Sequence, residues 1–126
     1  MYSVEVTNKG TGEFTATARG NTCVIEPAGN GFGPAEVLLA SLGSCVGYFI
    51  RLYCEQTKID LTEFTVSLES EFSREKPMAL RQIGVKVDLK GFALDPRRKE
   101  ALLAFVKNCP IKATLEANPR VDVSIV

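Results

Sequence analysis

The strongest constraint on the fold is a long apolar segment, Pro34 to about Gln56, which the sequence predicts to be one helix. Pro34 suits the first turn of a helix, and the apolar residues that follow recur at three- and four-residue steps. These apolar positions cover both sides of the helix, with Val37, Leu38, Leu42, Cys45, Phe49, Leu52 and Tyr53 on one side and Leu39, Val46 and Ile50 on the other. A helix that is apolar nearly all round is buried from more than one direction. In a chain of 126 residues, a second subunit is a natural source of the extra cover.

Strand patterns flank this helix on both sides. Alternating or β-branched runs predict six strands, over residues 2–7, 13–19, 22–27, 62–73, 81–91 and 120–126. Asp95 as N-cap and Pro96 at the first helical position predict a second helix, and Pro110 begins a short third one. There is no internal repeat, linker or low-complexity tract. This order of elements predicts a single α+β domain over residues 1–126.

Composition and charge exclude several classes of function. The net charge is zero, so the chain lacks the excess of positive charge that drives binding to nucleic acid. No stretch reaches the roughly 18 to 20 uninterrupted apolar residues needed to cross a bilayer, and the first ten residues do not resemble a signal peptide. We therefore expect no nucleic-acid or membrane partner and a cytoplasmic location, where free thiols are normal. The chain has no histidine, which excludes every catalytic or metal site that needs one.

The four cysteines are Cys23, Cys45, Cys54 and Cys109, and no two of them form a C-x-x-C motif. Without such a pair or a histidine, a metal site is not expected. Cys45 and Cys54 lie nine residues apart on the predicted helix, which puts them on opposite faces and about 13 Å apart, too far for a disulfide. We expect Cys23 and Cys54 to pack in the core.

Cys109 and Cys45 are the two cysteines with a possible chemical role. Cys109 directly precedes Pro110, at the start of a helical turn whose free backbone N–H groups favour a thiolate. Cys45 lies in mid-helix among apolar residues, where its pKa should be raised unless a cation lies nearby. The residues alone leave two interpretations open, a Cys45–Cys109 redox pair or two buried structural thiols, and they favour the second.

A resemblance to a known family changes this balance. The segments Gly33–Cys45, Ile83–Gly91 and Asn108–Pro110, with Thr15–Asn21 near the N-terminus, resemble the OsmC/Ohr family of thiol-dependent hydroperoxide reductases. Their order and spacing cover nearly the whole chain. The resemblance implies an OsmC-like α+β fold, with antiparallel sheets packed on a long buried central helix. It also implies an intertwined homodimer with active sites at the interface.

The resemblance further implies a role for each candidate residue. Cys45 matches the cysteine that attacks an organic hydroperoxide, and Cys109 matches the resolving cysteine, which closes a disulfide that a dithiol then reduces. Arg19 matches an arginine that would lower the pKa of Cys45 and orient the peroxide. No metal or organic cofactor is required. An apolar lining from Leu38, Leu42 and Phe49 would favour alkyl or lipid peroxides over hydrogen peroxide.

Glu36 departs from the family pattern. In the hydroperoxide branch of the family a glutamate directly follows the proline, whereas here Ala35 follows Pro34 and Glu36 comes one place later. On a regular helix Glu36 lies on the face opposite Cys45, and its alternative role is that of a first-turn carboxylate that stabilises the helix. Arg19 likewise has an alternative as a solvent-facing strand residue.

The sequence therefore predicts a cytoplasmic, homodimeric thiol peroxidase that acts on organic hydroperoxides, with Cys45, Cys109, Arg19 and Glu36 as candidate catalytic residues. Two other classes of function stay open. One is a thiol enzyme of another reaction, such as disulfide exchange or detoxification of an electrophile. The other is a non-catalytic module that binds an apolar small molecule in the dimer cleft.

Overall fold

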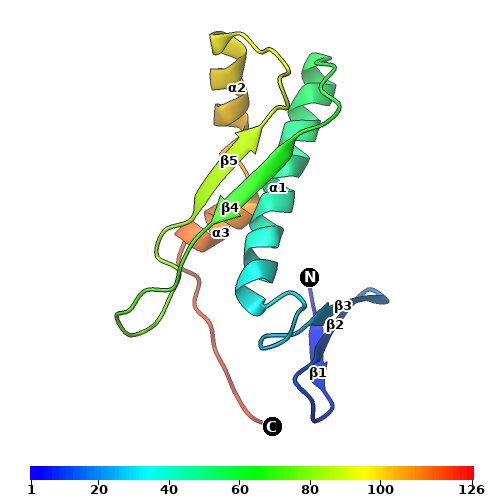
Figure 1. The fold of residues 1–126 in the computed structure, drawn as a ribbon, viewed down its shortest axis with the longest axis vertical. Helices are drawn as coiled ribbons and strands as arrows, with labels where there is room; N and C mark the ends of the chain where they lie inside the picture. The colour runs from blue at the N-terminus through cyan, green and yellow to red at the C-terminus, as the bar shows by residue number, and fades with distance from the viewer. The chain divides into compact units, whose positions relative to one another are not determined.

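The computed structural model describes residues 1–126, which form an N-terminal unit, Met1–Ala40, and a C-terminal unit, Ser41–Val126. Figure 1 shows the elements in chain order: β1 (Glu5–Asn8), β2 (Phe14–Ala18), β3 (Asn21–Ile25), α1 (Pro34–Thr57), β4 (Thr65–Glu69), β5 (Gly84–Asp88), α2 (Pro96–Val106) and α3 (Pro110–Glu116). The α+β fold class and the long helix beginning at Pro34 are confirmed.

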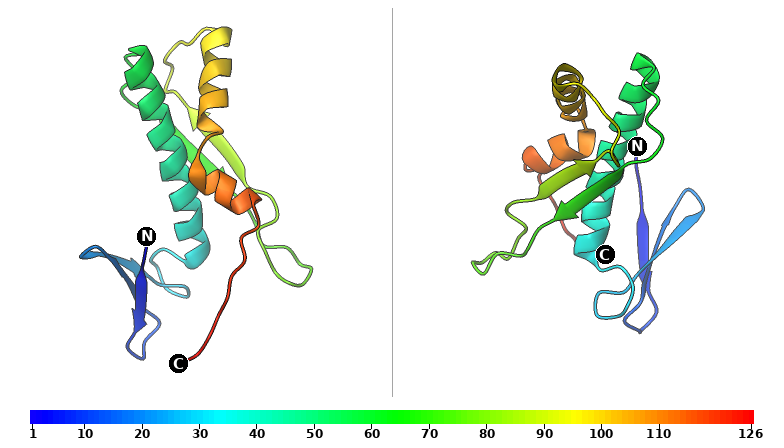
Figure 2. Two further views of the ribbon diagram at one scale, coloured as in Figure 1. Left: turned by 180° about the vertical axis from the view of Figure 1, so that it is seen from behind. Right: turned by 45° about the horizontal axis from the view of Figure 1, so that its top comes forward.

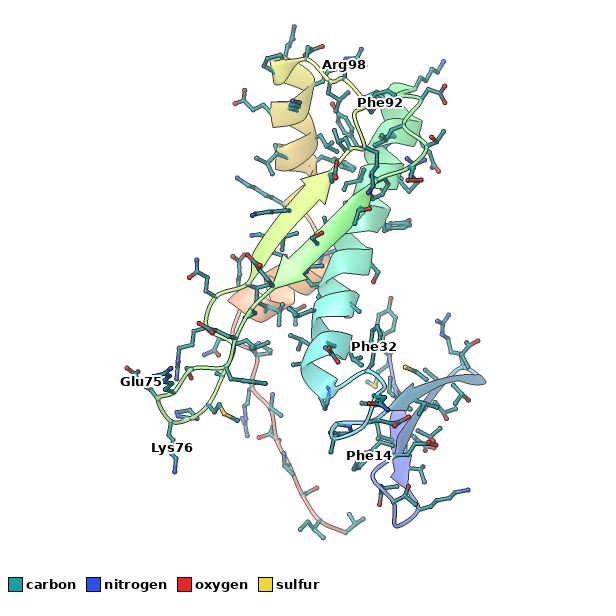
Figure 3. All side chains as sticks on the ribbon, viewed as in Figure 1. Phe14, Phe32, Glu75, Lys76, Phe92 and Arg98 are labelled. Carbon is teal, nitrogen blue, oxygen red and sulfur yellow. The ribbon has the colours of Figure 1, made fainter.

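The N-terminal unit is a three-stranded antiparallel sheet in the order β1-β2-β3, followed by a loop and the first turns of α1. The Asn8 side chain closes the β1–β2 turn, because its Nδ2 donates to the carbonyl oxygen of Thr11 at 2.7 Å. The loop before α1 is closed by the backbone N–H of Glu26, which donates to the carbonyl of Phe32 at 2.8 Å. Figure 3 labels Phe14 on β2 and Phe32 in this loop.

The C-terminal unit is built around α1. Its buried core includes Leu42, Val46, Ile50 and Cys54, which recur every four residues and so share one face of the helix. β4 and β5 pair antiparallel, with Val66 opposite Val87. Helix and sheet approach closely, since a Cβ built on Gly43 would lie 2.6 Å from Leu68 Cδ1. A glycine at this position therefore allows α1 to pack directly against β4.

The helices α2 and α3 complete the C-terminal unit, and Figure 2 shows α2 running beside α1, followed by the short helix α3 at an angle to it. Asp95 caps α2 as predicted, with its Oδ1 accepting a hydrogen bond from the backbone N–H of Arg98 at 2.9 Å. Leu102 is the buried residue of this helix. Figure 3 shows Phe92 and Arg98 near the start of α2, while Glu75 and Lys76 stand at the outer tip of the β4–β5 connection.

Two expectations about the strands and the core are wrong. Residues 120–126 form no strand: Val121, Val123 and Ile125 alternate as a strand would, but they are 78%, 88% and 98% exposed because no neighbouring strand pairs with them in their unit. Cys23 is exposed rather than packed, because no second layer covers β3 within the N-terminal unit. Both segments carry apolar residues that their own unit leaves uncovered.

By length and composition alone, α1 could cross a membrane. This is weak evidence, because the core helix of a soluble protein meets the same criterion. The residues of α1 that are buried in the C-terminal unit contact protein rather than lipid, and they belong to a core that also includes Leu61, Leu94 and Leu102.

Candidate active site

Cys45 lies on the part of α1 that belongs to the C-terminal unit. Its side chain is half-buried, and its neighbour Val46 is 3% exposed. Leu42, one turn before it, is 4% exposed and belongs to the core. The thiol therefore lies at the margin of the apolar core, with part of its surface open.

Cys109 occupies the junction between α2 and α3 and is fully buried. Its backbone N–H donates to the carbonyl of Val106 at 3.1 Å, and its own carbonyl accepts from the N–H of Ala113 at 3.1 Å. It is the N-cap of α3, and Pro110 takes the first helical position. The prediction that Cys109 stands at a helix start is therefore confirmed, and its backbone is held from both sides.

The structure brings these two cysteines together. Burial raises the pKa of the Cys45 thiol, and a side-chain hydrogen bond with Cys109 raises that pKa further. Both cysteines are free thiols, and Cys45 packs against the buried cluster to which Cys109 belongs. Two neighbouring thiols of this kind can form a disulfide when they are oxidised.

The backbone N–H of Ile111 also contacts Cys45 and acts in the opposite direction, since its hydrogen bond to the sulfur lowers the pKa of Cys45. We expected the free N–H groups at the start of α3 to stabilise a thiolate on Cys109, but the Cys109 side chain makes no capping hydrogen bond. Ile111 was missed from the sequence. The signal for it is the Cys-Pro helix start itself, because the first N–H groups of a helix have no partner within it.

Arg19 lies in the N-terminal unit, in the two-residue turn that joins β2 to β3. Arg19 and Gly20 have φ angles of 52° and 78°, the backbone that a tight turn of this kind requires. Its carbonyl accepts a hydrogen bond from Asn21 Nδ2 at 3.3 Å, but its exposed guanidinium makes no hydrogen bond or ion pair. The structure thus leaves this cation available, and its catalytic role stays a prediction.

Glu36 lies in the first turn of α1, within the N-terminal unit, and caps that helix. Its Oε1 accepts a hydrogen bond from the backbone N–H of Gly33 at 2.7 Å, which satisfies one of the donors at the helix start. This is the role of a first-turn carboxylate that the sequence offered as the alternative. Its assignment as a catalytic residue stays a prediction.

The other two cysteines lie apart from this pair. Cys54 is 2% exposed, as expected of a core residue, whereas Cys23 is exposed on β3. Burial raises the pKa of Cys54, and the nearby positive charge of Arg51 lowers it. No group of three or more cysteine, aspartate or glutamate side chains lies where it could hold a metal ion.

Aromatic side chains lie next to Cys45 along the same face of α1. Phe49 and Tyr53 both pack on Phe105 of α2, with ring centroids 5.7 Å and 5.6 Å apart. Of the apolar residues expected to line a peroxide site, Phe49 is half-buried here, while Leu42 is committed to the core. The larger hollows of the unit, of about 880 and 770 Å³, include neither cysteine of the pair.

Comparison with known protein families identifies the chain. Residues 27–124 match the family described as OsmC-like protein. The chain belongs to the OsmC-like family. This match confirms the resemblance carried by the helix segment and the later Cys-Pro pair, and the family is associated with peroxide-related redox function.

Solved structures of OsmC-like proteins share the fold. An OsmC-like protein from Mycoplasma pneumoniae is 19% identical, with a TM-score of 0.80 over 94% of this chain and 89% of its own. An organic hydroperoxide resistance protein, OsmC, from Legionella pneumophila is 18% identical, with a TM-score of 0.66 over 94% and 92% of the two chains. An OsmC-like protein of unknown function from Vibrio cholerae is 14% identical, with a TM-score of 0.76 over 92% and 94%. No protein with a curated description matches this chain.

Proposed function

We propose that this OsmC-like protein is a thiol-dependent peroxidase that reduces organic hydroperoxides to alcohols. The observation that carries the proposal is the contact between Cys45 and Cys109, two free thiols from distant parts of the chain. Two neighbouring thiols can lose two electrons and form a disulfide, and a dithiol can reduce that disulfide back to two thiols. The organic hydroperoxide resistance protein from Legionella pneumophila, which shares the fold, is consistent with this chemistry.

The reaction has three balanced steps. The Cys45 thiolate attacks the outer peroxide oxygen, the O–O bond breaks, and the leaving alkoxide takes a proton to become the alcohol, which leaves Cys45 as a sulfenic acid. The Cys109 sulfur then attacks the Cys45 sulfur, forming the disulfide and releasing water. A dithiol reductant finally returns both cysteines to thiols and is itself oxidised to a disulfide.

The difference in exposure between the two cysteines supports the roles proposed for them. Cys45 is half-buried, so a peroxide can reach its sulfur, whereas Cys109 is 0% exposed and cannot meet a peroxide directly. Cys109 is nevertheless in contact with Cys45, as a resolving cysteine has to be. The proposal therefore takes Cys45 as the nucleophile and Cys109 as the resolver.

The proposal also requires a positive charge. The surroundings of Cys45 in its own unit raise its pKa, and no cation contributes to that shift. We propose that Arg19 supplies this charge, because its guanidinium is exposed and unpaired. Glu36, which is engaged in capping α1, is a weaker candidate for orienting Arg19.

A homodimer and a cytoplasmic location belong to the same proposal. The unpaired segment 120–126 and the exposed side chains Leu38 and Tyr48 of α1 are apolar surface that a second copy could cover. A reducing compartment would supply the dithiol that completes each cycle.

The test is a single-turnover titration of the fully reduced protein with cumene hydroperoxide. Loss of thiols is followed against added peroxide, and the disulfide is located by peptide mass spectrometry. The proposal predicts loss of two thiols per chain and a link between Cys45 and Cys109. Thiols that do not react, or oxidation that begins at the exposed Cys23, would overturn it.

One observation favours a second candidate function. Because burial raises the pKa of Cys45, the thiol could be an inert part of a module that binds an apolar small molecule. In that case Cys45→Ser would leave ligand binding intact, and Cys45 would alkylate slowly at neutral pH even in the assembled protein. The rate of alkylation by iodoacetamide at pH 7 separates the two functions.

A further inference from the structure

We infer that the reductant attacks the sulfur of Cys45, and not that of Cys109, when it opens the Cys45–Cys109 disulfide. This inference rests on the proposed function, because it concerns the disulfide which that function forms. It defines the covalent intermediate between the protein and its reductant. It also defines the surface of the chain at which the reductant has to dock.

The first argument is the difference in exposure between the two sulfurs. Cys109 is 0% exposed, enclosed between α2, α3 and α1, whereas Cys45 keeps part of its surface open. A second subunit can only reduce the exposure of a residue, so no assembly of intact chains opens a path to Cys109. A thiolate has to reach the sulfur that it attacks, and only Cys45 satisfies that condition.

The second argument is that oxidation does not require Cys109 to leave its place. Its backbone is fixed by hydrogen bonds to Val106 and from Ala113, and its side chain already contacts Cys45. Closing the disulfide therefore needs mainly a movement of the Cys45 side chain toward Cys109. Cys109 remains enclosed in the oxidised protein, and the open side of Cys45 remains the point of attack.

The exchange then follows one balanced course. A reductant thiolate forms a bond to the Cys45 sulfur while the Cys45–Cys109 bond breaks, and Cys109 leaves as a thiolate that takes up a proton. The second thiol of the reductant then loses its proton and attacks the reductant's first sulfur, which is bonded to Cys45 in this mixed disulfide. Cys45 is released as a thiolate. The reductant ends as a disulfide, and two electrons have passed to the protein.

The experiment traps the mixed disulfide with a monothiol, which has no second thiol to release Cys45 within the adduct, so that the adduct lasts long enough to be quenched. The full-length Cys23→Ser protein, which lacks the exposed competing thiol, is oxidised with diamide so that no peroxide is needed. Excess β-mercaptoethanol is added, and the mixture is quenched in acid after short intervals and mapped by peptide mass spectrometry. We expect the adduct on Cys45 and a free thiol on Cys109. An adduct on Cys109, or equal adducts on both, would overturn the inference.

A second measurement does not depend on trapping a short-lived species. In the Cys23→Ser background, the Cys109→Ser and Cys45→Ser proteins each keep one cysteine of the pair, and both are treated with 5,5′-dithiobis(2-nitrobenzoate). We expect Cys45 to react more than about tenfold faster than Cys109, since exchange rates depend on access. Equal rates in proteins whose circular dichroism shows them folded would contradict the inference.

These results separate the inference from the proposed function. If diamide forms the disulfide but cumene hydroperoxide does not, the peroxidase proposal fails while the site of thiol attack is still measured. If diamide fails to link Cys45 and Cys109 in the folded protein, the inference is overturned as well, because the disulfide it describes does not form.

Discussion

Cys45 and Cys54 lie nine residues apart on α1, and burial raises the pKa of both thiols. The two side chains nevertheless differ in their exposure and in the groups that lie beside them. Cys45 is half-buried, and a hydrogen bond with a second thiol, Cys109, raises its pKa, while no cation contributes to the shift. Cys54 has the cation Arg51 nearby but is 2% exposed and has no thiol partner. Under the proposed function, the comparison teaches that a charge near a sulfur is not enough for redox chemistry: the sulfur also needs to be accessible and to lie beside a second thiol with which it can form a disulfide.

The largest effect should separate these two cysteines directly. Cys45→Ser removes the proposed nucleophile, and we expect the rate of thiol loss with cumene hydroperoxide to fall by a factor on the order of a thousand or more. Cys54→Ala removes a buried sulfur that has no thiol partner, and we expect the rate to stay within about twofold of the original while the free energy of unfolding falls by about 1 kcal/mol. Stopped-flow thiol assays and denaturant unfolding measure the two effects. Equal loss of activity in both variants would break the distinction.

The second effect concerns the partner thiol. Cys109→Ser leaves Cys45 exposed to peroxide but removes the sulfur that closes the disulfide. We expect the first turnover to proceed, and then the Cys45 sulfenic acid to be oxidised further to the irreversible sulfinic acid. Intact-protein mass spectrometry would show the gain of two oxygen atoms instead of the loss of two hydrogens. A stable sulfenic acid under excess peroxide would mean that Cys45 is protected in another way.

The sequence could predict much of this pair, because both cysteines lie in strongly patterned segments. The apolar steps after Pro34 predict α1, and the Cys-Pro pair predicts the junction at Cys109, so each thiol is placed on its own element. Their contact could not be read from spacing, since it depends on how α3 packs against α1. The family resemblance supplied that pairing, and the contact in the structure agrees with it.

Other features could not be predicted because their patterns require a neighbour that the chain itself does not supply. Residues 120–126 alternate like a strand, but a strand forms only against a paired edge, and the segment stays unpaired. Cys23 stands beside apolar residues in the sequence, but burial depends on a covering layer that the N-terminal unit lacks. Local pattern predicts the conformation of a segment, while its burial is decided by what packs against it.

A smaller effect on the rate of thiol loss should show whether the positive charge of Arg19 activates Cys45. We expect Arg19→Gln to slow peroxide-driven thiol loss at pH 7 by roughly three- to tenfold, because a higher pKa leaves less thiolate while each remaining thiolate is somewhat more nucleophilic. The direction of the pKa shift determines the pH dependence. Because its own surroundings raise the pKa of Cys45, the thiol without Arg19 is mostly protonated at pH 7, and the rate should rise steeply from pH 7 to pH 9 as the thiolate forms. The original protein should show a flatter profile.

The control for this prediction is Arg74→Gln, which removes another exposed arginine that makes no ion pair in the chain. It should change neither the rate nor the pH profile. If Arg19→Gln behaves in the same way as Arg74→Gln, Arg19 does not activate Cys45, and the raised pKa of Cys45 would favour the binding-module alternative.

The smallest effect on activity should come from Arg51, the cation near Cys54. Its Nη2 donates to the carbonyl of Leu61, and its guanidinium lies 5.3 Å from the centroid of the Phe64 ring. Arg51→Met removes both contacts, so the free energy of unfolding should fall by about 1 to 2 kcal/mol. The pKa of Cys54 should rise, because the charge that lowers it is gone.

The rate of Cys45 oxidation in Arg51→Met should nevertheless stay within about twofold of the original, because Arg51 does not contribute to the pKa of Cys45. Arg51→Lys is the matched variant: it keeps the positive charge but loses the planar group that packs on Phe64. If Arg51→Met slowed Cys45 oxidation and Arg51→Lys restored it, the charge of Arg51 would act along α1 on the reactive thiol. Arg51 would then replace Arg19 as the source of activation, and the contrast between the surroundings of Cys45 and Cys54 would no longer hold.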